Sequence, residues 1–188
     1  MALVDRVKNI IVSPRTEWPR IAEEPATVGS LYTGYIMILA AIGPIALAIH
    51  SATIGAGFGI GAAIVGYVIG LGITYVLALI VDALAPMFNG ERSFIQSLKL
   101  TAYSYTAAWV AGIFNLFGWF GGILAFIAMI YSFYVFYLGV PVMKKVSPDK
   151  AVGYTIIVVV CGIVLGFLLS GMLMGMLFGG AMLGAGMR

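Results

Sequence analysis

The sequence predicts an all-α, polytopic membrane protein: a bundle of five transmembrane helices preceded by a short amphipathic helix on the cytoplasmic face. Hydrophobic residues make up 62% of the 188 residues and charged residues only 9%, against about 25% charged in ordinary soluble domains. No Asp, Glu, Lys or Arg occurs in residues 25–81, 100–143 or 151–187. Because a charge is costly to place in hydrocarbon, these stretches mark where the chain meets lipid.

The length of these stretches predicts five spans. An α-helix needs about 20 apolar residues to cross a bilayer, so the stretches accommodate two, two and one crossings. The apolar runs lack the alternation of barrel strands, which leaves helices as the way to pair backbone groups in lipid. We expect a leader at residues 1–24 and a membrane domain at residues 25–188, with spans near residues 31–51, 58–84, 94–117, 119–140 and 152–178.

The distribution of basic residues predicts the orientation of the spans. Cytoplasmic loops of membrane proteins carry an excess of Lys and Arg. Four basic residues precede the first span, two lie between the second and third, and three lie between the fourth and fifth, whereas only Arg188 lies on the other side. The amino terminus and both charged loops are therefore expected in the cytoplasm, and the carboxy terminus outside.

The leader has the pattern of a short amphipathic helix that Pro14 ends. Its apolar face holds Leu3, Val4, Val7, Ile10 and Ile11. Its polar face holds Asp5, Arg6, Lys8 and Asn9. Such a helix can lie flat on the inner leaflet with its basic residues near anionic headgroups. Packing over the cytoplasmic end of the bundle explains the same pattern equally well.

Five short sequence motifs occur along the chain in an order and spacing that, taken together, are typical of a known family. They are Ser13–Trp18 (SPRTEW), Asp82–Gly90 (DALAPMFNG), Lys99–Thr106 (KLTAYSYT), Tyr137–Pro141 (YLGVP) and Asp149–Tyr154 (DKAVGY). With these motifs the chain resembles the bacterial branch of the Yip (Rab/Ypt-interacting) membrane protein family over nearly its whole length. The resemblance implies an inner (plasma) membrane protein of a bacterium.

The resemblance also implies what the chain does not share with its eukaryotic counterparts. Eukaryotic Yip proteins have a cytosolic amino-terminal region before five spans, and they associate with Rab-type GTPases and with one another in vesicle trafficking. The present chain has no long amino-terminal cytosolic region and no Asp-Leu-Tyr-Gly-Pro motif. These departures argue against GTPase binding.

Asp82 and Lys99 are the candidate ion pair of the membrane domain. Asp82 ends the second span, Lys99 lies about as far into the third, and the turn at residues 89–90 would fold these helices into an antiparallel pair. The pair either fixes the helix register or forms an ion or proton site. Tyr103 and Tyr105 belong to a hydroxyl-rich segment that either bonds to neighbouring helices or lines a polar cavity with Asp82.

Two further surfaces are candidates for contacts. In the loop of residues 141–150, Lys144, Lys145 and Lys150 either only signal topology or contact lipid headgroups or an inner-face partner. In the last span, small residues recur every four positions, a spacing that lets helices approach closely. These residues are Gly162, Gly166 and Ser170, followed by Gly171 and Gly175. Packing inside the monomer and self-association into a homo-oligomer both explain them.

The sequence offers little for chemistry. It has one histidine, no GxSxG, HExxH or phosphate-binding glycine pattern, and no cluster of acidic metal ligands. We therefore expect no catalytic residue, no metal and no cofactor, and the scattered basic residues do not predict nucleic-acid binding. A scaffold or interaction protein, with the lipid bilayer, a second copy or an unidentified protein as partner, is the favoured function. The alternative is a small-solute or ion transporter with a cytoplasm-facing polar site around Asp82.

Overall fold

The computed structural model describes residues 2–55 and 59–185, and of residues 59, 170 and 172–185 it describes the backbone alone. Every regular element in these ranges is helical, which agrees with the predicted class. In chain order the elements are α1 (Leu3–Val12), α2 (Pro14–Glu23), α3 (Val28–Leu31), the π-helical η1 (Tyr32–Ile36), α4 (Met37–Ala40), α5 (Ile42–Thr53), α6 (Gly59–Leu84), the 3₁₀ turn η2 (Ala85–Phe88), α7 (Phe94–Ser104), α8 (Thr106–Ala111), the 3₁₀ turn η3 (Gly112–Phe117), α9 (Trp119–Lys144) and α10 (Pro148–Ala185).

In the described part of the chain, four helices have the length and apolar composition to cross a membrane. They are Val28–Thr53, Ile60–Phe88, Trp119–Lys144 and Pro148–Leu169. The segment 94–117, which we expected as the third of five spans, is not among them, because polar residues such as Gln96, Lys99 and Asn115 make it less apolar than the four. Its helix also breaks at Tyr105 and ends in the 3₁₀ turn η3. Hydroxyl groups accompany the break: Thr106 Oγ1 donates to Tyr103 O at 2.7 Å, and such back-bonding bends helices.

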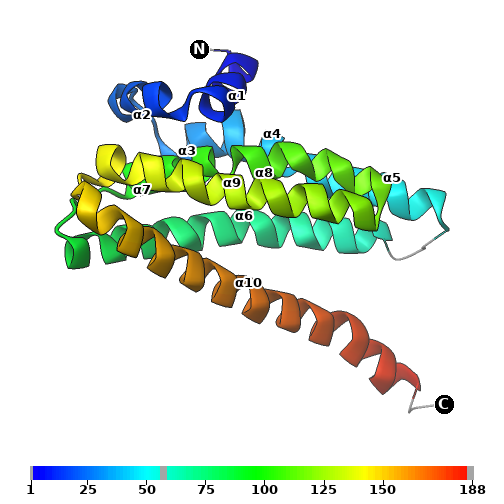
Figure 1. The fold of residues 1–188 in the computed structure, drawn as a ribbon. Helices are drawn as coiled ribbons and strands as arrows, with labels where there is room; N and C mark the ends of the chain where they lie inside the picture. The colour runs from blue at the N-terminus through cyan, green and yellow to red at the C-terminus, as the bar shows by residue number, and fades with distance from the viewer. Residues whose placement is uncertain (1, 56–58, 186–188) are drawn as a thin grey trace.

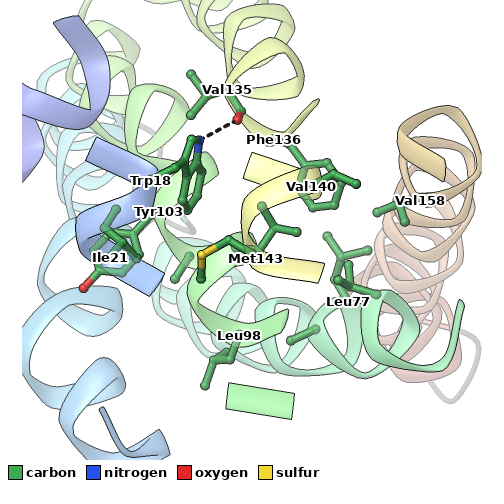
Figure 2. Packing of buried hydrophobic residues seen from close by; sticks show 14 of the residues in the cluster. Trp18, Ile21, Leu77, Leu98, Tyr103, Val135, Phe136, Val140, Met143 and Val158 are labelled. Atoms are coloured by element: carbon green, nitrogen blue, oxygen red, sulfur yellow. Dashed lines mark hydrogen bonds between the residues drawn. The ribbon is translucent and has the colours of Figure 1, made fainter. Parts of the chain in front are cut away.

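α7 is the central helix of the bundle. Its residues 97–104 are all buried, and it contacts α3, α6, α8 and α9. Figure 2 shows the core beside it, to which α6 contributes Leu77, α9 contributes Val140 and α10 contributes Val158. α10 contacts α6 and α9 and then diverges from the other helices toward the carboxy terminus (Figure 1). Because residues 97–104 are buried, their polar side chains need hydrogen-bond partners. Ser97 and Lys99 find them on neighbouring segments and Thr101 on its own helix, whereas Ser104 Oγ has none among the described residues.

The leader packs against the bundle rather than standing apart from it. α1 and α2 lie on one flank of the long helices (Figure 1). Trp18 of α2 is fully buried, and its indole Nε1–H donates to Val135 O of α9 at 3.0 Å (Figure 2). The Tyr131 hydroxyl of α9 donates to Ile11 O of α1 at 2.6 Å. Of the two expected placements, packing on the bundle is the one that these contacts describe.

The expected division of the leader into an apolar and a polar face is wrong at two positions. Arg6, assigned to the polar face, is 4% exposed, whereas Val4, assigned to the apolar face, is 74% exposed. The reason is that Glu17 and Glu24 meet the Arg6 guanidinium. A charge that is paired in this way can be buried, and the opposite side of α1 is left to face outward.

Candidate functional site

Two polar clusters lie on different sides of α7, and together they contain the buried charges of the described chain. We call the first the Asp82 cluster, which consists of Asp82, Ser93, Ser97 and Lys144. We call the second the leader cluster, which consists of Arg6, Glu17, Glu24 and Lys99. Each cluster joins segments that are far apart in the sequence.

The Asp82 cluster is built around one carboxylate oxygen. Asp82 Oδ1 accepts from Lys144 Nζ at 2.8 Å, from the Ser93 backbone N–H at 2.8 Å and from Ser97 Oγ at 3.0 Å. Lys144 Nζ also donates to Ser97 Oγ at 2.8 Å and to Ser93 O at 3.3 Å. Lys144 is fully buried, and the Asp82 side chain is 20% exposed. The cluster therefore holds the end of α6, the start of α7 and the end of α9 together.

The expected Asp82–Lys99 ion pair is wrong, because Lys144 is the cation beside Asp82. Successive residues of an α-helix are rotated by about 100°, so Lys99 points to nearly the opposite side of α7 from Ser97. There the Lys99 ammonium donates to Ile21 O at 2.8 Å and to Glu24 O. These are carbonyl groups at the end of α2, where a cation is favourable.

The leader cluster joins α1, α2 and α7. The Arg6 guanidinium donates to Glu17 and to Glu24, and it lies 5.7 Å from the ring centroid of Tyr103. Glu17 is 1% exposed and Lys99 is 2% exposed. The ion pairs of Arg6 thus join α1 to the end of α2, and the Lys99 ammonium and the Tyr103 ring attach this leader to the bundle.

The two tyrosines named as site residues lie apart from Asp82 and from each other. Tyr103 packs on Tyr35 with ring centroids 4.5 Å apart, and the Tyr35 hydroxyl bonds Thr106 Oγ1 at 2.6 Å. Tyr105 instead packs on Trp109, with ring centroids 6.1 Å apart, and lines a groove that α9 and α10 complete. Hydroxyl bonding between helices therefore accounts for part of this polar segment.

The three lysines of the loop 141–150 have different surroundings. Lys144 is the last residue of α9 and points inward to Asp82, so its expected contact with headgroups or a partner is wrong. Lys145 is 66% exposed and pairs with Glu91 at 2.8 Å, which brings the two basic loops together. Lys150 is partly exposed on the first turn of α10. A contact through Lys145 and Lys150 stays a prediction.

The glycines of α10 do not make close helix contacts within the described monomer. A Cβ atom at Gly162 would meet Leu77 of α6 at an ordinary 3.6 Å, and one at Gly166 or Gly171 would meet nothing within 4 Å. Ser170 and Gly175, the other members of this face, lie outside the residues whose surroundings are described. Packing inside the monomer is therefore wrong for Gly166 and Gly171, and self-association stays a prediction.

The close approaches occur at glycines that were not singled out from the sequence. A Cβ atom at Gly112 would lie 2.7 Å from the Gly43 Cα, and one at Gly139 would lie 2.6 Å from ring carbon Cε2 of Trp18. Gly139 belongs to no regular small-residue repeat, so no spacing signal was available for it. Gly112 ends the repeat Ser104, Ala108 and Gly112, a signal that was overlooked. The leader charges Glu17 and Glu24 were missed as well. The only feature of the sequence that pointed to ion pairs in the leader is that acidic residues accompany the basic ones before the first span.

A cavity of about 210 Å³ adjoins the leader cluster. Its polar lining includes Arg6, Glu24, Lys99 and Tyr103, and Asp82 does not line it. The described residues contain no group of three or more His, Cys, Asp or Glu that could hold a metal ion. The two polar clusters and the cavity can therefore bind charged groups and hold helices together.

The match to a known family covers the Asp82 cluster and, apart from Arg6, the leader cluster. The model of the Yip1 domain matches residues 8–170. The chain belongs to the Yip family. The resemblance to the Yip family drawn from the local motifs is thereby confirmed, and its bacterial branch stays a prediction. No curated protein or solved structure matches the chain.

The Yip1 domain of this chain includes most of the leader. The match begins at residue 8, inside α1, and runs without interruption into the membrane helices. The contacts of Trp18 and Lys99 join the same two parts in space. The protein is thus a multi-pass membrane protein of the Yip family whose leader is packed as part of the domain.

Proposed function

We propose that this Yip-family protein is a non-enzymatic membrane scaffold or interaction protein. The observation that carries the proposal is the use made of its buried charges. Arg6 and Glu17 join the two leader helices to each other, Lys99 binds the leader to α7, and Lys144 and Asp82 bind α6, α7 and α9 to one another. Buried charges that are already paired favour a fixed framework over a site that exchanges ions or protons.

We also propose that segment 94–117 is a fifth crossing, with the amino terminus in the cytoplasm and the carboxy terminus outside. Two contacts support this topology. α7 begins beside the Asp82 cluster at one end of the bundle, and the segment ends at Gly118, against His50 near the end of α5. The basic loops that meet through Lys145 and Glu91 lie on one side, as an excess of Lys and Arg in cytoplasmic loops requires.

The topology test uses single cysteines in a Cys161→Ser background. A cysteine at Lys145 should react with a membrane-impermeant maleimide only after the membrane is opened, and a cysteine at Arg188 should react in intact cells. If both positions react on the same side of the membrane, the five-span topology is wrong.

A transporter is the second candidate, and one observation favours it. The cavity beside the leader cluster reaches Tyr103 and Lys99, so polar surface extends into the bundle. Against transport stands Asp82, whose carboxylate is already engaged by Lys144, Ser93 and Ser97.

Two experiments separate the candidates. Proteoliposomes carrying the protein should show no proton, sodium or potassium flux above that of empty vesicles. A flux that Asp82→Asn abolishes would overturn the scaffold proposal.

The second experiment places a photo-crosslinking residue at Val12, which is 70% exposed on α1, or at Lys145. In native membranes the scaffold should crosslink there to a discrete partner protein or to a second copy. The matched control is Val160, which is 52% exposed on the apolar helix α10 and should crosslink to lipid. Identical products at all three positions would contradict the proposal.

A further inference from the structure

The cavity beside the leader cluster is a polar site that the scaffold does not require. It lies between α1, the connection after α2, η1 and α7. Three of its lining residues carry hydrogen-bond donors: Arg6, Lys99 and Tyr103. Glu24, Ser30 and Gly34 also line it. A concave site with a few convergent polar groups is the usual form of a ligand site.

The inner part of the cavity presents donors that the described protein leaves in part unused. Lys99 gives two N–H groups to Ile21 O and Glu24 O, and an ammonium has three. Arg6 gives one N–H to Glu17 and one to Glu24, and a guanidinium has five. The Tyr103 hydroxyl bonds no other described residue. Donors of this kind, on two cations and a phenol, suit the oxygen atoms of a phosphate.

The cavity also contains a carboxylate, which makes a ligand of purely negative charge a poor fit. The charges of Arg6 and Lys99 are balanced by those of Glu17 and Glu24, and Arg20 touches Glu17 only from outside, at 3.6 Å. The Arg6 side chain is 5% exposed, whereas that of Glu24 is 47% exposed. The cations therefore lie deep and Glu24 lies at the rim. A ligand with a phosphate and an adjoining amine would leave the balance unchanged, because each of its charges meets an opposite one.

The mouth of the cavity opens toward the apolar surface of the first membrane helix. Gly34 lines the cavity and is exposed, and a Cβ atom built there would meet nothing within 4 Å. Ile38 and Ile45 follow on the same membrane helix and are 49% and 57% exposed. Exposed apolar side chains on a membrane helix face acyl chains. A ligand in the cavity can therefore continue into lipid.

We propose that this cavity binds the headgroup of a phospholipid that carries a phosphate and a primary amine, as phosphatidylethanolamine does. The phosphate accepts from Lys99, Tyr103 and Arg6. The ammonium group donates to the free carboxylate oxygen of Glu24, and the acyl chains leave past Gly34.

The test compares three lipids with identical acyl chains on the delipidated full-length protein by native mass spectrometry. Phosphatidylethanolamine should bind about tenfold more tightly than phosphatidylcholine, whose quaternary nitrogen cannot donate to Glu24. Phosphatidylglycerol should bind more weakly than phosphatidylethanolamine because it lacks the amine. Glu24→Gln should bring the first two lipids to about equal affinity.

Tyr103→Phe and Tyr105→Phe form the matched pair of variants. Neither hydroxyl bonds another described residue, so both variants should fold as the parent does. Tyr103→Phe should weaken phosphatidylethanolamine binding about tenfold or more, the loss of one hydrogen bond to a charged group. Tyr105→Phe, in which the ring faces α10 rather than the cavity, should leave binding unchanged.

Three results would overturn the proposal. They are equal binding of the three lipids, tighter binding of phosphatidylglycerol than of phosphatidylethanolamine, and equal effects of the two tyrosine variants. Competition by soluble phosphoethanolamine at the same concentration as the lipid would assign the site to a free aminophosphate instead. Because these readouts measure lipid alone, they are independent of the flux and crosslinking tests of the scaffold.

Discussion

Replacement of Lys144 by methionine should destabilise the protein far more than replacement of its neighbour Lys145. Both lysines form ion pairs with a 2.8 Å N–O distance, Lys144 with Asp82 and Lys145 with Glu91. They differ in burial, since the Lys144 side chain is 0% exposed and that of Lys145 is 66% exposed. The comparison therefore isolates the effect of burial on an ion pair.

The magnitude follows from the surroundings of Asp82. Two unit charges 2.8 Å apart attract by about 6 kcal/mol at an effective dielectric constant of about 20, and the cost of removing both from water offsets part of this. Lys144→Met leaves the Asp82 carboxylate with only Ser93 N–H and Ser97 Oγ as donors. Breaking one side of a buried pair costs about 3–5 kcal/mol, whereas an exposed pair such as Lys145–Glu91 is worth about 0–1 kcal/mol.

The assay is reversible unfolding in mixed micelles, followed by tryptophan fluorescence, on a double-mutant cycle of Asp82→Asn and Lys144→Met. The double variant should be at least about 2 kcal/mol more stable than the sum of the single effects implies. A second cycle of Asp82→Asn with Lys99→Met should be additive within about 0.5 kcal/mol, because Lys99 makes its bonds to α2. Additivity in the first cycle or coupling in the second would refute the assignment of Lys144 as the partner.

Substitutions at Trp18 and Gly139 test how the leader is attached to the bundle, and one at Arg6 tests the ion pair that holds its two helices together. Trp18→Ala should lower the free energy of unfolding by about 3–5 kcal/mol and make the leader accessible to limited proteolysis. Trp18→Phe loses mainly one hydrogen bond and should lower it by about 1–2 kcal/mol. Equal losses in the two variants would contradict the packing of the indole. Gly139→Ala should cost about 1–3 kcal/mol by overpacking against Trp18, with Gly166→Ala as the control that costs nothing because its surroundings are open. Arg6→Met should cost about 3–5 kcal/mol in the same unfolding assay, since it leaves Glu17 buried without its cation; a loss below about 1 kcal/mol would show that Glu17 does not depend on Arg6.

The membrane character of this chain could be predicted from its sequence because contact with lipid constrains the composition of each segment separately. Stretches without charge must be helical and long enough to cross, and four of the expected spans have counterparts among the long apolar helices. The segment at residues 94–117 is different. It is less apolar than the other four, and its hydroxyl groups bond to its own backbone at Thr101 and Thr106. The absence of charge from residues 100–143 hid this difference, because it does not count Ser, Thr, Tyr and Asn.

The candidate site was predicted less well than the spans. Asp82 was singled out as a member of an ion pair, and it does form one, but with Lys144 rather than Lys99. Both lysines were available at the same end of the bundle. Choosing between them requires the rotation of α7 about its axis, which places Ser97 rather than Lys99 toward Asp82. Arg6 was assigned to the surface because nothing in a linear pattern reveals that two carboxylates fold back onto it.

The charge-free stretches thus determine which segments are helical and in contact with lipid, and the basic residues between them predict which loops share one side of the membrane. Each of these properties depends on the composition of a single segment. The packing of helices specifies which charges meet. It joins Arg6 to Glu17, Lys99 to the end of α2, and Lys144 to Asp82. These pairings depend on the relative rotation of segments that lie up to 78 residues apart, and hydrogen bonds and ion pairs act only over a few ångströms.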